Sequence, residues 1–447
     1  MNENALQRLR EEMTPCRFTL ENGLTVLVRE MPQFRGVHAI YATRFGSADL
    51  SFELDGQRIT LPEGTAHFLE HKMFENADGV DAFALYERTG AMANAYTSFE
   101  KTCYVFTSTR DVEQNLDILL DFVSHPYFTE QTVKKELGII GQEIKMYADN
   151  AEFQMMFGLL GALYHRCPVR TDIAGTVDSI AAITPEVLYR CCEAFYAPQN
   201  MVLSVAGNVT ARQVLDACAR ADIRPQPHQL RRLPPQEPET VCCPFVERKM
   251  PVSLPIWGIG FKQRADFGAS LRGRLICDFV TELLAGETSP LYNRLYDEGL
   301  INAGFSGEYL SGEGYCALYF AGDTRDPEVL QQAVWAEIDR LLAEGVDAEQ
   351  FDCTKNMMLG ELITGLENIE DVAYDQAVAW LEGYAPHEAV EALAALTAAD
   401  VQAALPQLLR RENSAVMIIW PDGTEDASDE DSLPDEDDAS EDTDLID

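Results

Sequence analysis

Two of the seven histidines in the chain lie one helical turn apart, in the segment His67-Phe68-Leu69-Glu70-His71. Residues i and i+4 of a helix share a face about 5–6 Å apart, so both imidazoles can bind one Zn²⁺ ion. Glu70 lies on the same face, three residues after His67. A catalytic zinc leaves one position open for water, which a glutamate beside it can deprotonate as a general base. The pattern H-x-x-E-H therefore predicts metal-assisted hydrolysis.

The third zinc ligand must come from another element of the chain. A predicted helix over residues 129–147 carries Glu136 and Glu143 two turns apart on one face, and both are candidates. The spacing does not choose between them, and an arbitrary helix glutamate is more often solvated than bound to a metal. Roughly one chain in a hundred of this length and composition would contain H-x-x-E-H by chance. The motif alone is therefore moderately specific.

Hydrophobic periodicity places the histidine motif on a short helix over residues 64–74. Further helices are predicted over 78–88, 111–124 and 129–147, and one from Thr184 to Phe195 with a capping threonine and a proline at its first turn. Strands over 17–20 and 24–28 flank Asn22-Gly23, a pair typical of tight hairpin turns. We expect a strand over 38–45 to join this hairpin, an alternating strand over 93–108, and a buried strand over 201–206.

Six prolines between residues 223 and 245 exclude a helix or a central strand from that polar stretch. We therefore expect a domain over 1–222, a linker over 223–245 and a second domain over 246–421. The second domain is predicted to contain strands over 256–261, 309–320 and 415–420, a helix over 271–284, and several helices between 327 and 405. Clusters of strands followed by clusters of helices favour an α+β fold, with helices on one face of each sheet.

The composition is that of a globular protein with a large acidic excess. Hydrophobic residues make up 46% of the 447 residues, and the formal net charge is −40. Fourteen acidic residues and no lysine or arginine lie between 422 and 447, so we expect a disordered acidic tail after a body of charge −26. This charge argues against nucleic acid or an anionic membrane as a partner. No apolar run reaches the ~20 residues of a membrane span.

The eleven cysteines are an odd number and include no C-x-x-C pair. The chain also opens without the pattern of a secretory signal peptide. Both observations favour reduced thiols and a cytoplasmic protein.

These motifs together resemble one known family, the pitrilysin/insulinase family of zinc peptidases, which includes the mitochondrial processing peptidases. The resemblance covers nearly the whole chain except the acidic tail. Within the family, the sequence is most similar to the bacterial proteins associated with aminopentanol modification of elongation factor P. The residues that carry the resemblance are Gly64-Thr65-Ala66 with the histidine motif, Gly90, Asn94-Ala95-Tyr96-Thr97, Thr102-Cys103-Tyr104, Glu136-x6-Glu143-Ile144, Tyr164-His165, Gly175, and Tyr196-x-Pro198-x-Asn200-Met201.

The resemblance implies one Zn²⁺ ion per chain, bound by His67, His71 and Glu143. It also implies two acids in the catalytic machinery, Glu70 as the base and Glu136 as an acid that supports the site. The expected activity is that of a zinc endopeptidase acting on short unfolded peptides in an enclosed chamber.

The resemblance further implies two homologous α+β domains that form half of a clamshell, with Asn94 contacting the backbone of the substrate. Active members of the family usually carry in the second domain an arginine and, seven positions later, a tyrosine that grip the substrate. Here Tyr296 and Ala303 stand at those positions. A full chamber needs two half-shells, so we expect either a homodimer or a heterodimer with a zinc-less paralogue that supplies the missing pair. The alternative is a non-peptidolytic assembly or processing subunit that retains zinc.

Overall fold

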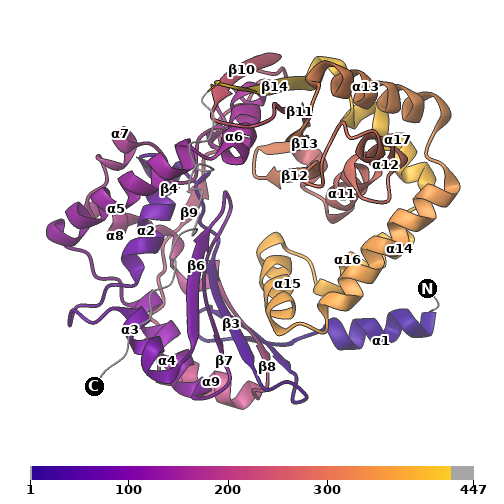
Figure 1. Cartoon of the computed structure of the whole chain (residues 1–447). Coiled ribbons are helices and arrows are strands. Elements are labelled where there is room, and N and C mark those ends of the chain that lie inside the picture. The colour runs from indigo at the N-terminus through magenta and orange to yellow at the C-terminus, as the bar shows by residue number, and fades with distance from the viewer. Residues whose placement is uncertain (1–2, 424–447) are drawn as a thin grey trace, which may run out of the picture.

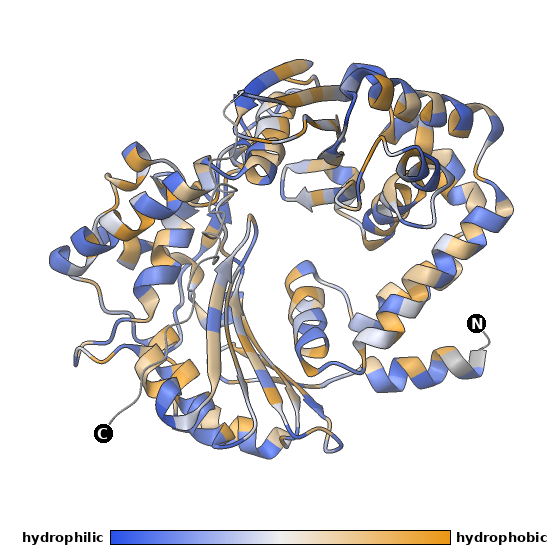
Figure 2. Ribbon diagram, viewed as in Figure 1, coloured by the Kyte–Doolittle hydropathy of each residue, from blue (hydrophilic) through white to orange (hydrophobic). Residues whose placement is uncertain are grey.

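The structure is a computed structural model, and it describes residues 3–423. Two halves, each built around a β-sheet, lie side by side (Figure 1). Apart from Asp422 and Gly423, the predicted acidic tail lies outside the described residues. Figure 2 shows hydrophilic and hydrophobic residues side by side along most helices, as amphipathic helices require.

The first half precedes the proline-rich stretch. Its helices and strands are α1 (Glu3–Met13), β1 (Cys16–Thr19), β2 (Thr25–Glu30), β3 (Val37–Thr43), β4 (Ser51–Leu54), β5 (Gln57–Thr60), α2 (Thr65–Met73), α3 (Ala82–Thr89), β6 (Met92–Thr97), β7 (Thr102–Ser108), α4 (Val112–Ser124), α5 (Glu130–Ala148), α6 (Ala151–Leu163), α7 (Val177–Ile180), α8 (Pro185–Phe195), β8 (Met201–Gly207) and α9 (Ala211–Arg220).

The proline-rich stretch contributes one short strand, β9 (Leu230–Arg232), at the edge of a small sheet with β4 and β5. The second half follows. Its helices and strands are β10 (Phe245–Met250), β11 (Ile256–Lys262), α10 (Ala265–Gly268), α11 (Leu271–Ala285), α12 (Pro290–Asp297), β12 (Ser306–Gly312), β13 (Tyr315–Asp323), α13 (Pro327–Glu344), α14 (Ala348–Gly365), α15 (Ile369–Glu382), α16 (Pro386–Ala395), α17 (Ala398–Leu408) and β14 (Ser414–Pro421).

The two large sheets share a core of five strands with the same topology, and the first sheet has the additional edge strand β1. The first runs β1-β2-β8-β3-β7-β6 and the second runs β10-β14-β11-β13-β12. In each sheet one pair is parallel, β2 with β8 and β10 with β14, and every other pair is antiparallel. The chain therefore repeats one α+β arrangement twice, and the predicted fold class is confirmed.

Most predicted elements of the first half are present, with two corrections. The hairpin of β1 and β2 forms, and Gly23 adopts the positive φ of 96° that its turn requires. The predicted third strand, β3, does not pair with this hairpin, because β8 lies between β2 and β3. The predicted strand over 93–108 is a hairpin of β6 and β7, closed by a hydrogen bond from Ser98 N to Lys101 O. The turn between the two strands contains neither glycine nor proline. The alternation of apolar and polar residues therefore continued across it and indicated a single strand.

The two halves exchange a helix. Helix α6 of the first half packs on β14 and β11 of the second sheet, where Met155 and Leu159 lie against Met417 and Ile419. Helix α15 of the second half packs on β8 and β3 of the first sheet, and Figure 1 shows it apart from the other second-half helices.

Each exchanged helix covers the face of a sheet that the sheet's own helices leave free. Ser204 Oγ on β8 donates a hydrogen bond of 2.8 Å to Ala373 O on α15. Helices therefore lie on both faces of each sheet, which corrects the expectation of one covered face. The predicted boundary between domains stays a prediction, and the packing of α6 and α15 crosses it in both directions.

A buried ion pair fixes the proline-rich stretch to both halves. Glu237 accepts hydrogen bonds from the backbone N–H groups of His165, Arg166 and Cys167 in the first half. Lys262 on β11 of the second half lies 2.7 Å from the same carboxylate, and the two side chains are 4% and 8% exposed. Such a pair persists in the interior because hydrogen bonds satisfy both of its charges.

All eleven cysteines lie within the described residues and have free thiols. No helix in the same part of the chain has the length and apolar character needed to cross a membrane. The cytoplasmic location stays a prediction.

Candidate zinc centre

A close contact between two loops sets the start of helix α2, which carries the histidine motif. Gly64 precedes the helix with a φ of 86°, and Gly175 on the facing loop has a φ of 75°. A Cβ atom at Gly175 would lie 2.6 Å from Glu63 O, so the two loops can approach only because both positions are glycine. This approach brings α2 beside the loop that contains Asp172.

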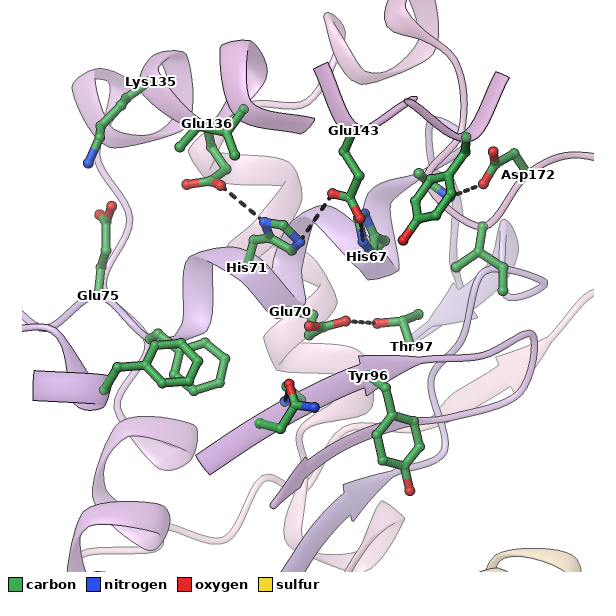
Figure 3. A pocket seen from close by; sticks show the side chains of 18 of the residues that line it. His67, Glu70, His71, Glu75, Tyr96, Thr97, Lys135, Glu136, Glu143 and Asp172 are labelled. Carbon is green, nitrogen blue, oxygen red and sulfur yellow. Dashed lines mark hydrogen bonds and ion pairs between the residues drawn. The ribbon is translucent and has the colours of Figure 1, made fainter. Parts of the chain in front are cut away.

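The side chains of His67 and His71 on α2 point toward Glu143 on α5 (Figure 3). His67 Nε2 lies 3.5 Å from one carboxylate oxygen of Glu143, and His71 Nε2 lies 3.6 Å from the other. The capping box of Thr129 and Thr132 starts α5, and Glu143 lies three to four turns later. The structure thus brings together all three residues that the family resemblance assigned to the metal.

These residues fit a zinc ion. One donor atom from each lies within 4.8 Å of the other two. Two ligands about 2.0–2.1 Å from a tetrahedral zinc are themselves roughly 3.4 Å apart. The nitrogen-to-oxygen separations of 3.5 and 3.6 Å match that spacing. Two imidazoles and one carboxylate are also a donor set found in catalytic zinc sites.

Glu136 lies behind His71 rather than in the ligand group. Its carboxylate is 3.1 Å from His71 Nδ1, the ring nitrogen that faces away from Glu143. The other oxygen of Glu136 is 3.5 Å from the fully buried Nζ of Lys72, which also pairs with Glu75 at 2.6 Å. A carboxylate on the far nitrogen fixes the tautomer and orientation of a zinc-binding imidazole. Glu136 is therefore a positioning residue for His71.

The charges of the site favour the deprotonated acids that a metal needs. The pKa of Glu143 is lowered, first by its hydrogen bond with His67. Burial raises the pKa of Glu136, but the hydrogen bond with His71 and the charge of Lys72 outweigh burial and lower it overall. Burial also opposes the charged form of His71, while the hydrogen bond with Glu136 and the charge of Glu70 raise its pKa overall.

Glu70 is buried on the same helix, between the two histidines and the sheet. Thr97 on β6 donates a hydrogen bond of 2.7 Å from Oγ1 to Glu70 Oε2 (Figure 3). Because a carboxylate has two oxygens, this bond fixes one and leaves the other, Oε1, for a proton acceptor role. No local pattern in the sequence marks this role of Thr97.

These residues line one cavity of about 630 Å³. Asn94, the predicted contact for substrate, lies on β6 with an exposed side chain and also lines it. The apolar part of the cavity wall is formed by Phe74, Phe83, Ile139, Phe153 and Ile173. All the lining residues belong to the first half.

Two further lining residues were missed by the sequence analysis. Tyr147 lies one turn after Glu143 on α5, within hydrogen-bonding reach of its carboxylate. Burial and the nearby charge of Glu143 raise the pKa of Tyr147. Asp172 lies in the loop that faces α2, and burial raises its pKa. The i+4 spacing from Glu143 could have identified Tyr147, whereas no local pattern marks Asp172.

Tyr296 and Ala303 are the second-half residues at the positions where the resemblance implied an arginine and a tyrosine. Tyr296 is 51% exposed on α12 and stacks on Tyr292, with ring centroids 6.0 Å apart. Ala303 follows α12 in a loop. Neither residue lines the cavity.

Comparisons with known proteins agree with this arrangement. Two domain models of one family match the sequence. The model described as insulinase (peptidase family M16) matches residues 60–176, which hold the zinc group. The model described as the peptidase M16 inactive domain matches residues 182–358, including most of the second sheet.

Similar proteins extend the match over most of the chain. The uncharacterized zinc protease YmfH of Bacillus subtilis is 36% identical over 90% of this chain and 95% of its own length. A crystal structure described as that of an M16-like peptidase from Alicyclobacillus acidocaldarius has a TM-score of 0.88, 34% identity, and coverage of 91% and 98% of the two chains.

Pitrilysin shares the fold. It has a TM-score of 0.70 and 17% identity, and the match covers 91% of this chain and 44% of pitrilysin. The repeated α+β halves, the zinc-binding geometry and these matches together show that the chain belongs to the pitrilysin/insulinase family, peptidase family M16.

Proposed function

We propose that the protein is a zinc-dependent endopeptidase that hydrolyses short unfolded peptides. One observation carries this proposal: the donor atoms of His67, His71 and Glu143 converge in a cavity that Glu70 also lines. A structural zinc site would more commonly have four protein ligands and would need no base.

The chain's own residues can carry the proton transfers of peptide hydrolysis. A zinc ion bound here would polarise the scissile carbonyl and lower the pKa of a water molecule. Glu70, held by Thr97, accepts the proton of the attacking water and delivers it to the leaving amine nitrogen. Glu136 keeps His71 in the tautomer that leaves Nε2 free as a ligand.

Strand β6 offers a binding edge for the backbone of an extended peptide. It is the last strand of the first sheet and, among the described strands, pairs with β7 alone, so its outer edge is open to a further strand. At this edge, Ala95 N–H donates a hydrogen bond to Asn94 Oδ1. Peptides commonly add to such an edge as a further strand. We place the substrate along β6, with Asn94 beside its backbone and Glu70 near the scissile bond.

A second half-shell would close the cavity. Every lining residue comes from the first half, so this cavity is not enclosed by the second half of the chain. We propose a homodimer, or a heterodimer with a zinc-less paralogue that brings an arginine and a tyrosine to the substrate. Sedimentation of the purified chain distinguishes a stable self-dimer from a monomer that requires another partner.

The first test is a mass-spectrometric scan of a mixed peptide library incubated with zinc-loaded protein. Glu70→Gln is the matched control, because it preserves size and removes the proton acceptor. Cleavage that disappears in Glu70→Gln supports an autonomous peptidase. Absence of cleavage by a protein that holds one zinc per chain would contradict it.

The second candidate function is a zinc-retaining assembly or processing subunit that does not cleave peptides alone. The position of Tyr296 and Ala303 outside the cavity favours it. This candidate predicts cleavage only after a paralogous partner is added, so the same library scan with and without the partner separates the two functions.

A further inference from the structure

We propose that Tyr147 donates a hydrogen bond from its phenolic hydroxyl to the oxyanion that develops on the scissile carbonyl. This inference rests on the proposed peptidase function. The second half of the chain places no residue in the cavity, so the donor to the oxyanion must come from the first half, and we assign it to helix α5. Stabilisation of a developing oxyanion is among the largest contributions to acyl-transfer catalysis.

The position of Tyr147 suits this task. It lies one helical turn after Glu143, so both side chains project from the same face of α5. Its hydroxyl is within hydrogen-bonding reach of the Glu143 carboxylate, and the charges of Asp172 and Glu70 also act on it. The phenol therefore lies beside a metal ligand in the wall of the cavity that also holds the general base, and the reacting carbonyl must enter that cavity.

The aromatic ring of Tyr147 is held in place. It stacks on Phe153 of α6, with ring centroids 4.6 Å apart and an interplanar angle of 17°. Both rings line the cavity. A donor whose direction is fixed before the reaction costs little reorganisation when negative charge appears, which is the condition for electrostatic catalysis.

The other donors in the cavity are less suited. Thr97 donates its hydroxyl proton to the general base Glu70 and must keep doing so to hold that base in place, whereas the hydrogen bond of Tyr147 to Glu143 holds no group that transfers a proton. Tyr96 points away from the two histidines, toward Cys103 and Tyr374 (Figure 3). Lys135 is exposed and precedes Glu136, on the far side of His71 from Glu143 (Figure 3). A phenol stays protonated at neutral pH, so it can donate a hydrogen bond without giving up its proton.

The proposed step balances in protons and electrons. A lone pair of water forms the new C–O bond, its proton moves to Glu70, and the π electrons of the carbonyl move onto oxygen. Tyr147 donates a hydrogen bond to that oxygen and keeps its proton. When the C–N bond breaks, the pair on oxygen re-forms the carbonyl, and Glu70 delivers the proton to the amine nitrogen.

The test is Tyr147→Phe, which preserves the stacking on Phe153 and removes one hydroxyl. We expect kcat to fall about 10²- to 10³-fold, as for the loss of one oxyanion donor, with KM changed less than about twofold. Zinc content should stay the same. The affinity for a phosphinic peptide, which imitates the tetrahedral transition state, should fall by the same factor as kcat when it is measured by calorimetry.

The calorimetric readout separates this inference from the proposed function. If the wild-type chain cleaves nothing, the proposed function fails, but the analogue still reports whether Tyr147 binds an oxyanion. Equal analogue affinity in wild type and Tyr147→Phe overturns the inference, as does a wild-type chain that holds zinc and binds no analogue. A loss of zinc affinity that accounts for the whole effect would instead make Tyr147 a positioning residue for Glu143, which also overturns it.

Tyr296→Phe is the matched control. It removes a phenol from the position where the family usually places its substrate-gripping arginine. We expect kcat and analogue affinity to stay within about twofold of wild type, because Tyr296 lies outside the cavity. A large loss in Tyr296→Phe, with none in Tyr147→Phe, would assign the donor to the second half and refute the inference.

Discussion

The two halves share one order of five strands, yet within residues 3–423 the first half alone carries a metal-binding group. Helices α2 and α11 follow the corresponding strands β3 and β11, and α5 and α14 follow the corresponding hairpins. Helix α2 turns His67 and His71 toward an open cavity, whereas α11 packs against α14, α16 and α17. The comparison teaches that this fold forms without a metal-binding site. Such a site is possible in the half where one helix face is not covered by other helices.

The corresponding face of the second half carries acids without histidines. Asp278 and Glu282 lie one turn apart on α11, and burial together with the charges of Glu282 and Glu361 raises the pKa of Asp278 to about 6. Across residues 3–423, His67, His71 and Glu143 form the one group of three side chains that could hold a metal ion. The acids of the second half carry like charges that repel one another, whereas the donor atoms of His67, His71 and Glu143 converge.

The sharpest test of this comparison is a pair of matched substitutions in the corresponding helices. Glu70→Gln on α2 should lower kcat about 10²- to 10⁴-fold, the usual contribution of a general base, while zinc content stays unchanged. Glu282→Gln on α11 should leave kcat unchanged. Equal losses in the two variants, measured with one cleaved peptide, would mean that both halves contribute to catalysis.

The junction between the halves should dominate stability. Lys262→Met leaves the Glu237 carboxylate buried without its partner, so we expect the free energy of unfolding to fall by about 3 kcal/mol. Urea denaturation followed by circular dichroism measures the change. The exposed pair of Arg264 and Asp266 is the control, because solvent screens it and breaking it with Arg264→Met should change stability far less. Similar losses in both variants would contradict the role of burial.

A second contact between the halves should depend on pH. Glu100, in the turn between β6 and β7, packs against Gly312 at the corresponding hairpin of β12 and β13. Burial, helped by the charge of Asp49, raises the pKa of Glu100 from its ordinary 4.5 to about 7, although Tyr315 and Arg232 favour the charged form. The protonated form is thus the one that the folded state prefers.

The sign of the pH effect follows from this raised pKa. Below pH 4.5 Glu100 is protonated in both states, and its contribution to stability is complete. As the pH rises through about 7, the wild type should lose about 3 kcal/mol that Glu100→Gln retains. Denaturation of both proteins at pH 5 and pH 8 measures the difference. Parallel pH profiles in wild type and variant would show that Glu100 ionises freely in the folded protein.

The smallest effect should come from the residue behind the metal ligands. Glu136→Gln should weaken zinc binding about 10- to 100-fold, because the amide cannot hold His71 through a charged hydrogen bond. Competition with a zinc chelator measures the affinity. Glu130→Gln, at the exposed first turn of the same helix, is the control and should bind zinc as the wild type does. If Glu136→Gln also keeps full affinity, Glu136 does not position His71.

The sequence by itself determined the parts of the protein that depend on near neighbours along the chain. The spacing of His67, Glu70 and His71 placed three side chains on one helix face, and the α+β fold followed from the order of strands and helices. It did not reveal the turn at Ser98–Lys101, because that turn contains neither glycine nor proline. It did not reveal the exchange of α6 and α15, because contacts between segments far apart leave no local periodicity.

The tertiary structure decided how Glu136 and Glu143 divide their roles. Both lie on one face of α5, so spacing alone left either as the third ligand, and the family resemblance chose Glu143. The way α2 packs beside α5 sets Glu143 opposite both Nε2 atoms and Glu136 behind His71. The packing of α2 on β6 brought Thr97 to Glu70, and the packing of α2 beside α5 brought Tyr147 to the cavity. The physical reason is that helix periodicity fixes directions within one element, whereas distances between elements depend on how their surfaces pack.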